Sequence, residues 1–129
     1  MSVIPHLDAK RRVMGLLPVM DGWAVFEDVA TGAHPPWIVV RFGQIGRALS
    51  EAVAVTSRIY TLEVRVVGAS ADSVNVACDR YQEALDGRHP DGMGALVPDV
   101  DSGVYAAELT DPDTGFQYVM RVLSWRCGQ

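Results

Sequence analysis

The chain has 129 residues, of which 49% are hydrophobic and 21% are charged, a composition typical of a folded protein rather than a disordered one. This length favours a single domain over residues 1–129 that needs no metal ion or disulfide for stability. The 11 Lys and Arg residues are outnumbered by 16 Asp and Glu residues, for a formal net charge of −5, which argues against a nucleic-acid-binding protein because basic side chains supply most of that affinity.

Two further absences narrow the class of protein. No apolar run of about 18 residues predicts a membrane span, and the first residues lack the pattern of a signal peptide. The two cysteines, Cys78 and Cys127, are too few for a disulfide framework and are expected to be reduced thiols inside a cell.

The first predicted element is a short helix over residues 6–17. Leu7, Met14 and Leu17 recur at helical intervals, and Pro18 ends the helix because proline cannot continue the hydrogen-bond ladder.

Two strands are predicted next, over residues 23–29 and 37–42, with a turn rich in glycine and proline between them. The second strand is apolar on both faces until Arg41.

Residues 43–56 are ambiguous. Ile45, Leu49 and Val53 are spaced by four, as on a helix, but the segment also contains two glycines, which weaken a helix. A helix, a hairpin and a flexible arm all remain open for this segment.

The clearest strand covers residues 58–67, because its side chains alternate between apolar and polar. The apolar face comprises Tyr60, Leu62, Val64 and Val66, and the other face comprises Thr61, Glu63 and Arg65.

A second helix is expected after Ser70, a plausible N-cap, and before Gly87, a typical residue just past a helix end. Residues 88–103 are predicted to be a long loop, and residues 104–109 and 116–125 a hairpin. Together these elements predict an α+β fold with two layers, a mainly antiparallel sheet of about five strands packed against two helices.

No arrangement of residues predicts an enzyme, a cofactor or a metal site. The three histidines lack metal-binding spacing. Cys78 falls on the apolar stripe of the second helix, where a free cysteine behaves as a small hydrophobic residue.

Contact with partners therefore becomes the main functional hypothesis. Aliphatic residues in the ambiguous segment should be covered by something, and a neighbouring subunit is one candidate. Charged residues on the outer strand faces indicate either a solvated surface or a polar subunit interface. The candidate interface residues are Ile45, Leu49, Val53, Val55, Arg41, Glu63 and Arg65.

The negative charge is concentrated in one stretch. From Asp86 to Asp113 there are seven acidic residues and one basic residue, a net charge of −6. This stretch is either a solvated surface that resists aggregation or a surface that repels or aligns a partner. The candidate residues of such an acidic loop are Asp91, Asp99 and Asp101.

The order of these elements resembles the tail terminator family of long-tailed bacteriophages, also described as tail completion or minor tail proteins. The resemblance rests on residues 36–40, the ambiguous segment, the long strand with its following glycine at 58–68, residues 70–74 and the helix end at 84–87. A short N-terminal helix and a closing hairpin extend the match over nearly the whole chain.

This resemblance implies a structural virion protein with no catalytic residue. Family members form a ring, usually a hexamer, at the head-proximal end of the tail, after assembly in the host cytoplasm. The ring ends polymerisation of the tail tube protein and joins the head through a connector protein, while DNA passes through without specific binding. On this reading, residues 43–56 pack on the next subunit and the acidic loop faces the lumen, where it repels DNA.

Two other functions stay open. One is a small cytosolic α+β domain that binds a ligand or regulates a partner, with a pocket between sheet and helices and residues 43–56 as its lid. The other is a related phage neck protein.

Overall fold

The computed structural model describes residues 4–32, 34–49, 51 and 55–129, and this part of the chain contains two helices and six strands. In chain order the elements are α1 (His6–Met14), β1 (Ala24–Glu27), β2 (Trp37–Leu49), β3 (Val55–Gly68), α2 (Ala71–Leu85), β4 (Val97–Asp101), β5 (Tyr105–Thr110) and β6 (Gln117–Gly128). The α+β fold predicted from the sequence is confirmed, with one strand more than expected.

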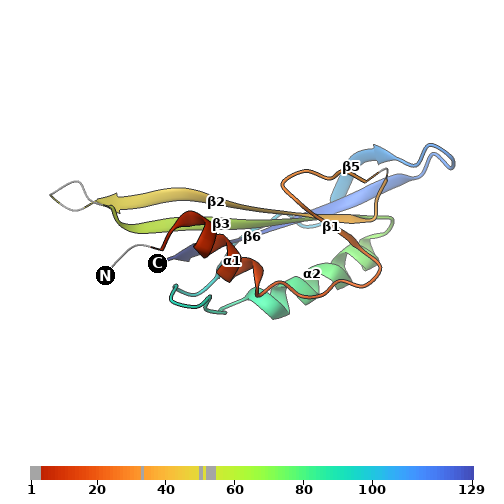
Figure 1. Cartoon of the computed structure of the whole chain (residues 1–129). Helices are drawn as coiled ribbons and strands as arrows, with labels where there is room; N and C mark the ends of the chain where they lie inside the picture. The colour runs from red at the N-terminus through yellow and green to blue at the C-terminus, as the bar shows by residue number, and fades with distance from the viewer. Residues whose placement is uncertain (1–3, 33, 50, 52–54) are drawn as a thin grey trace.

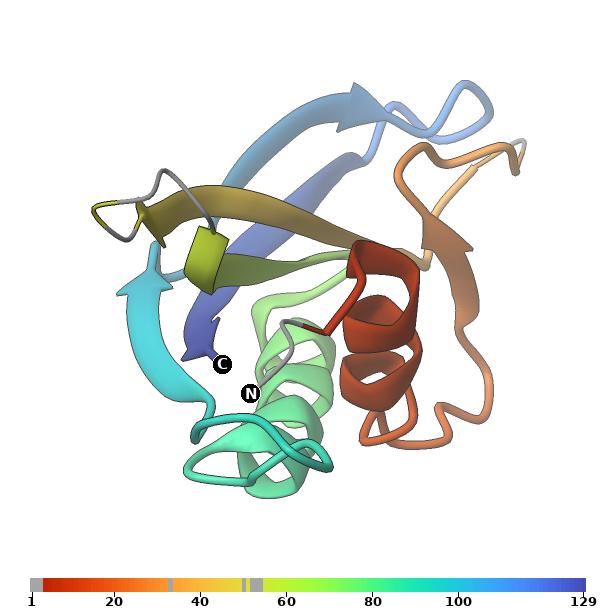
Figure 2. The same cartoon turned by 60° about the vertical axis from the view of Figure 1, so that its left-hand side comes forward.

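The sheet has the order β1-β2-β3-β6-β4 and is antiparallel except for the parallel pair β1–β2. β5 also pairs with β6, beside its first residues, whereas β4 pairs with the last residues of β6. The sheet is strongly curved and both helices lie on its concave side, as Figures 1 and 2 show.

The alternation in β3 determines which side of the sheet is buried. Its even-numbered residues from Tyr60 to Val66 are at most 1% exposed and pack against both helices, as the sequence predicts. The same face of β6 contributes Leu123 and Trp125 to this core. The opposite face, which we call the outer face, has a smaller apolar cluster around Val67, Tyr118 and Met120.

Helix α2 follows the sequence prediction closely. The Ser70 side chain accepts a hydrogen bond from the Ser73 amide at 3.2 Å, which satisfies one of the free N–H groups at the helix start. The helix ends at Leu85, and Gly87 adopts a φ of 70°, a conformation that favours glycine.

Helix α1 is shorter than predicted, since it ends at Met14. Its buried residues are Ala9 and Val13, whereas Leu7, expected on the apolar stripe, is 65% exposed. The imidazole of His6 lies 5.7 Å from the Tyr60 ring, centroid to centroid, and this ring contact holds the start of α1 against the sheet.

The prediction of an uninterrupted loop over residues 88–103 is wrong, because Val97–Asp101 forms β4 at the sheet edge. Proline and aspartate are rare in strands, so Pro98 and Asp99 concealed this strand. An edge position tolerates both, because Pro98 then loses no hydrogen bond to a neighbour on the open side.

The ambiguous segment also resolves into strand. β2 continues to Leu49 and β3 begins at Val55, so the described residues form a long hairpin and not a helix. The register shifts between Gln44 and Gly46. Residues four apart share one face of a strand as well as one face of a helix, so the spacing of the aliphatic residues did not separate the two, and the bulge further disturbs the alternation that identifies a strand.

The lengths of the elements leave part of this hairpin without a helix beneath it. The 14 residues of β3 span roughly 45 Å, whereas the 15 residues of α2 span roughly 22 Å. β6 ends at Gly128, opposite Ile59, so beyond that point β3 pairs only with β2. We call residues 45–49 and 55–59 the arm, which extends past the helix layer in Figure 1.

Matched leucines test the burial pattern. Leu85 in α2 is 0% exposed and Leu7 in α1 is 65% exposed. Leu85→Ala should lower the free energy of unfolding by about 2–5 kcal/mol because it leaves a cavity, and Leu7→Ala by less than about 0.5 kcal/mol. Urea unfolding followed by circular dichroism measures both changes, and equal losses would contradict the core described above.

Candidate functional site

The arm exposes aliphatic side chains on a two-stranded ribbon. Ile45 is 50% exposed and Leu49 is 48% exposed, and Ile59 is also exposed at the root of the arm. Of the other two aliphatic residues predicted at the interface, Val55 begins β3 opposite Leu49, and Val53 lies outside the described residues. A two-stranded ribbon is only marginally stable in water unless another surface packs against it, so the arm is suited to bind a partner.

The outer face contains a groove at the end of the molecule opposite the arm. Its volume is about 350 Å³. Asp28–Ala30, which follow β1, form one wall, and Ala107 and Leu109 of β5 form the other. Both segments rise above the sheet in Figure 1. The floor comprises Trp37, Val39, Arg41, Arg65, Val67 and Met120, and we call this feature the outer groove.

The three charged residues predicted at an interface all lie on the outer face. Arg41 and Glu63 are register partners on β2 and β3, and Arg65 donates a hydrogen bond to Glu63 at 3.1 Å. Arg41 makes no ion pair with any described residue. These charged residues therefore lie at the end of the groove that is nearer the arm, where Arg41 and Arg65 form part of its floor.

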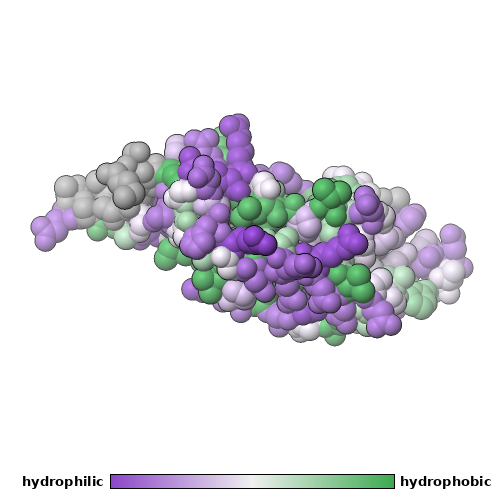
Figure 3. All heavy atoms as spheres, turned by 90° about the horizontal axis from the view of Figure 1, so that it is seen from below, coloured by the Kyte–Doolittle hydropathy of each residue, from purple (hydrophilic) through white to green (hydrophobic). Residues whose placement is uncertain are grey.

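The opposite side of the molecule differs in character. Figure 3 looks onto the helix layer, where hydrophilic residues predominate and hydrophobic ones occur in small separate groups. This is the pattern of an ordinary solvated surface, so the arm and the outer face are the better candidates for binding.

Two of the three candidate residues of the predicted acidic loop form ion pairs with arginines. Asp99 and Asp101 lie in β4, where Asp99 pairs with Arg126 at 3.0 Å and Asp101 with Arg121 at 2.6 Å. Asp91 is exposed, and its carboxylate has no ion pair with a described residue. Of the three candidate residues, Asp99 and Asp101 therefore have an arginine beside the carboxylate and Asp91 does not.

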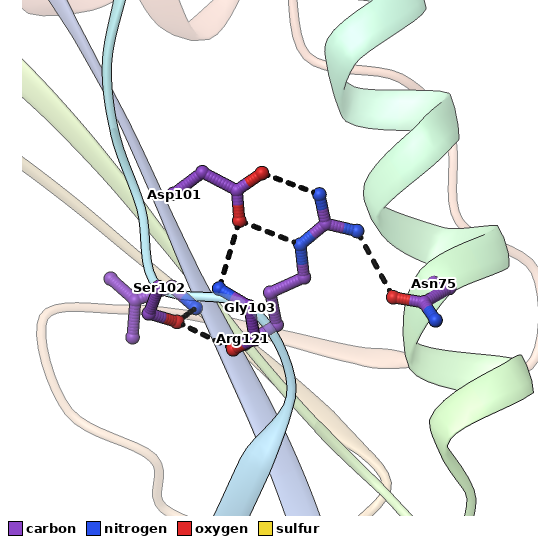
Figure 4. A network of polar contacts seen from close by, with 6 residues as sticks. Asn75, Asp101, Ser102, Gly103 and Arg121 are labelled. Atoms are coloured by element: carbon purple, nitrogen blue, oxygen red, sulfur yellow. Dashed lines mark hydrogen bonds and ion pairs between the residues drawn. The ribbon is translucent and has the colours of Figure 1, made fainter.

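Arg121 connects three elements through this contact. Its Nε and one terminal nitrogen donate to the two carboxylate oxygens of Asp101, and the other terminal nitrogen donates to the Asn75 amide oxygen at 3.0 Å. Figure 4 shows the guanidinium of β6 between β4 and α2. These hydrogen bonds hold the pKa of Asp101 below its ordinary value, so this aspartate has a structural role.

The sequence interpretation missed the outer groove, because its residues come from distant segments of the chain. One signal was present, since the strand at 37–42 is apolar on both faces before Arg41. Trp37 and Val39 now line the groove, while Ile38 and Val40 pack under the helices. A strand apolar on both faces indicates that both faces are covered.

Potential metal ligands and the thiol of Cys78 are the reactive groups singled out by the sequence. Within the described residues, no group of three or more His, Cys, Asp or Glu side chains is arranged to hold a metal ion. Cys78 is a buried residue of α2, and its burial raises the pKa of the thiol to about 11. At neutral pH this cysteine is a protonated core residue and a poor nucleophile.

A scan against protein-family models and a search of the curated proteins find no match to this sequence. Neither helix of the described residues has the length and hydrophobicity to span a membrane.

Removing the Asp101 carboxylate should weaken the attachment of β4. Asp101→Asn should lower the free energy of unfolding at pH 7 by about 1 kcal/mol, because a partly exposed charged pair contributes little more. Asp91→Asn removes a carboxylate that has no ion pair in the described structure. It should change the free energy of unfolding by less than about 0.5 kcal/mol.

The pH dependence follows from the same contact. The folded pKa of Asp101 lies below its ordinary value of 3.8, so its stabilising effect is present above pH 3.8 and is lost as the pH falls through the lowered pKa. The difference between wild type and Asp101→Asn should therefore shrink in acid. A difference that stays constant from neutral to strongly acidic pH, in urea titrations, would contradict this role.

Proposed function

We propose that this protein is a structural subunit that assembles with copies of itself into a ring, and that the ring caps the tail tube of a long-tailed bacteriophage. The arm is the observation that carries the proposal. It extends a pair of strands beyond the helix layer and exposes Ile45 and Leu49, a surface that a neighbouring subunit would cover.

The edges of the sheet support association through side chains rather than through added strands. β1 has only four residues. On the other edge, β4 contains Pro98 and β5 contains Glu108 at a φ of 58°. Short, bulged or proline-containing edges resist pairing with another strand, so growth of an endless intermolecular sheet is disfavoured.

The more specific role of a tail terminator is supported by the resemblance in the order of elements, in addition to the geometry of the arm. Such a ring would stop addition of the tail tube protein and would bind a head-tail connector protein. Asp99 and Asp101 are each paired with an arginine, so they are weaker candidates for a surface that repels DNA. Asp91 remains the candidate for that role.

One observation favours the alternative of a ligand-binding domain. The outer groove, at about 350 Å³, falls at the lower end of the range for small-molecule sites. The groove lies on the face away from the helices, whereas the space between sheet and helices is filled by core side chains. The arm extends away from this groove, so the arm of the same chain is not its lid.

Deletion of the gene from the phage genome tests the proposed role. Electron microscopy should show tail tubes of irregular, excessive length without heads, and a plasmid copy of the wild-type gene should restore virions. A copy carrying Ile45→Glu with Leu49→Glu should fail to restore them, because charged side chains on the arm prevent its burial against a neighbour.

The matched control is Val19→Glu, at a residue that is 82% exposed and lies away from the arm; it should restore virions fully. Normal virions after gene deletion would exclude the terminator role. Full rescue by the arm variant would exclude a role for the arm in assembly.

A further inference from the structure

We propose that the outer groove is the binding site for the arm of a second copy of this chain. The inference rests on the self-association proposed above and names the surface that receives the arm. It would make the contact between subunits heterologous, with a different surface contributed by each copy.

The floor and walls of the outer groove carry apolar side chains that could contact the apolar arm. Its floor includes Val67 and Met120, which are nearly buried, and its β5 wall presents Leu109, which is 40% exposed. The other wall presents Val29, which is also exposed. Two aliphatic walls above an apolar floor would cover the side chains of Ile45 and Leu49, which their own chain leaves in water.

The charges on the two surfaces are complementary. The groove carries Asp28 and Arg41, and neither forms an ion pair with a described residue. The arm carries Arg47, and Glu51 follows the end of β2; both are exposed and equally without an ion pair in the described part of the chain. The groove also carries Arg65, which pairs with Glu63 at 3.1 Å, and the arm also carries Arg58, which donates to the Ile4 carbonyl oxygen at 3.4 Å. With these two arginines bonded within their own chain, contacts of Arg47 with Asp28 and of Glu51 with Arg41 would fix the orientation of the arm.

The positions of the two surfaces exclude contact within one chain. In Figure 1 the arm extends from one end of the long sheet and β5, which forms one wall of the outer groove, lies toward the other end. Each copy would therefore insert its arm into one neighbour and receive an arm from another. Subunits joined by such contacts form a closed ring when the rotation from one subunit to the next adds up to a full turn.

Cysteine cross-linking tests this contact directly, because both native thiols are buried and burial raises the pKa of each. The wild-type protein should therefore be unreactive toward a short bis-maleimide at neutral pH. The test variant carries Leu49→Cys on the arm with Leu109→Cys in the groove, and the control carries Leu49→Cys with Val19→Cys. All three substituted side chains are exposed, so the fold is retained.

The test variant should form a ladder of covalent oligomers on a denaturing gel. The reaction should be faster than in the control by roughly a hundredfold, because docked thiols experience millimolar effective concentrations. A mixture of the two single variants, Leu49→Cys and Leu109→Cys, should give covalent dimers and nothing larger.

Each other outcome counts against the proposal. Equal cross-linking in test and control, while wild type still forms oligomers by sedimentation, would show that the arm docks elsewhere and would leave the proposed self-association intact. A wild type that stays monomeric at every concentration would overturn both. A small molecule bound to the monomer, blocked by Leu109→Glu in native mass spectrometry, would assign the groove to a ligand and overturn the inference.

Discussion

The alternation of side chains along β3 is the constraint on which the rest of the structure depends. β3 lies between β2 and β6 and pairs with both along most of its length. A shift of one residue would move Leu62 and Val64 from the core to the outer face. The two helices pack on the apolar side that this register creates, and the ion pair of Arg121 with Asp101 then fixes the edge strand β4 to the sheet.

The same strand is also longer than its own core requires. The helices cover only part of β3, so its first residues, together with the last residues of β2, form an arm without a helix beneath it. The exposed side chains of Ile45 and Leu49 lower the solubility of the monomer and do not contribute to its free energy of unfolding. A second copy of the chain would bury these side chains, and the outer groove is the surface proposed to receive them. The proposed self-association would thus follow from an imbalance between strand length and helix length.

Much of the fold could be predicted from local patterns, and the failures have physical causes. Ser70 and Gly87 mark the ends of α2 because caps depend on single residues. β4 escaped prediction because an edge strand tolerates Pro98 and Asp99. The aliphatic residues of the arm mark it as unusual, but their spacing of four fits one face of a helix or of a strand, and the bulge near Gly46 disturbs the alternation. The outer groove could not be predicted, because it forms only when the pairing of β6 with β3 and β5 brings distant segments together.

Hydrogen–deuterium exchange of the arm tests the central claim most directly. Peptides covering residues 44–49 and 57–59 should exchange rapidly in dilute, monomeric protein, because a two-stranded ribbon opens readily. In concentrated, assembled protein the same peptides should be strongly protected, while peptides from α2 should not change. Protection of the arm that is equally weak in both states, although the protein has assembled, would contradict the account.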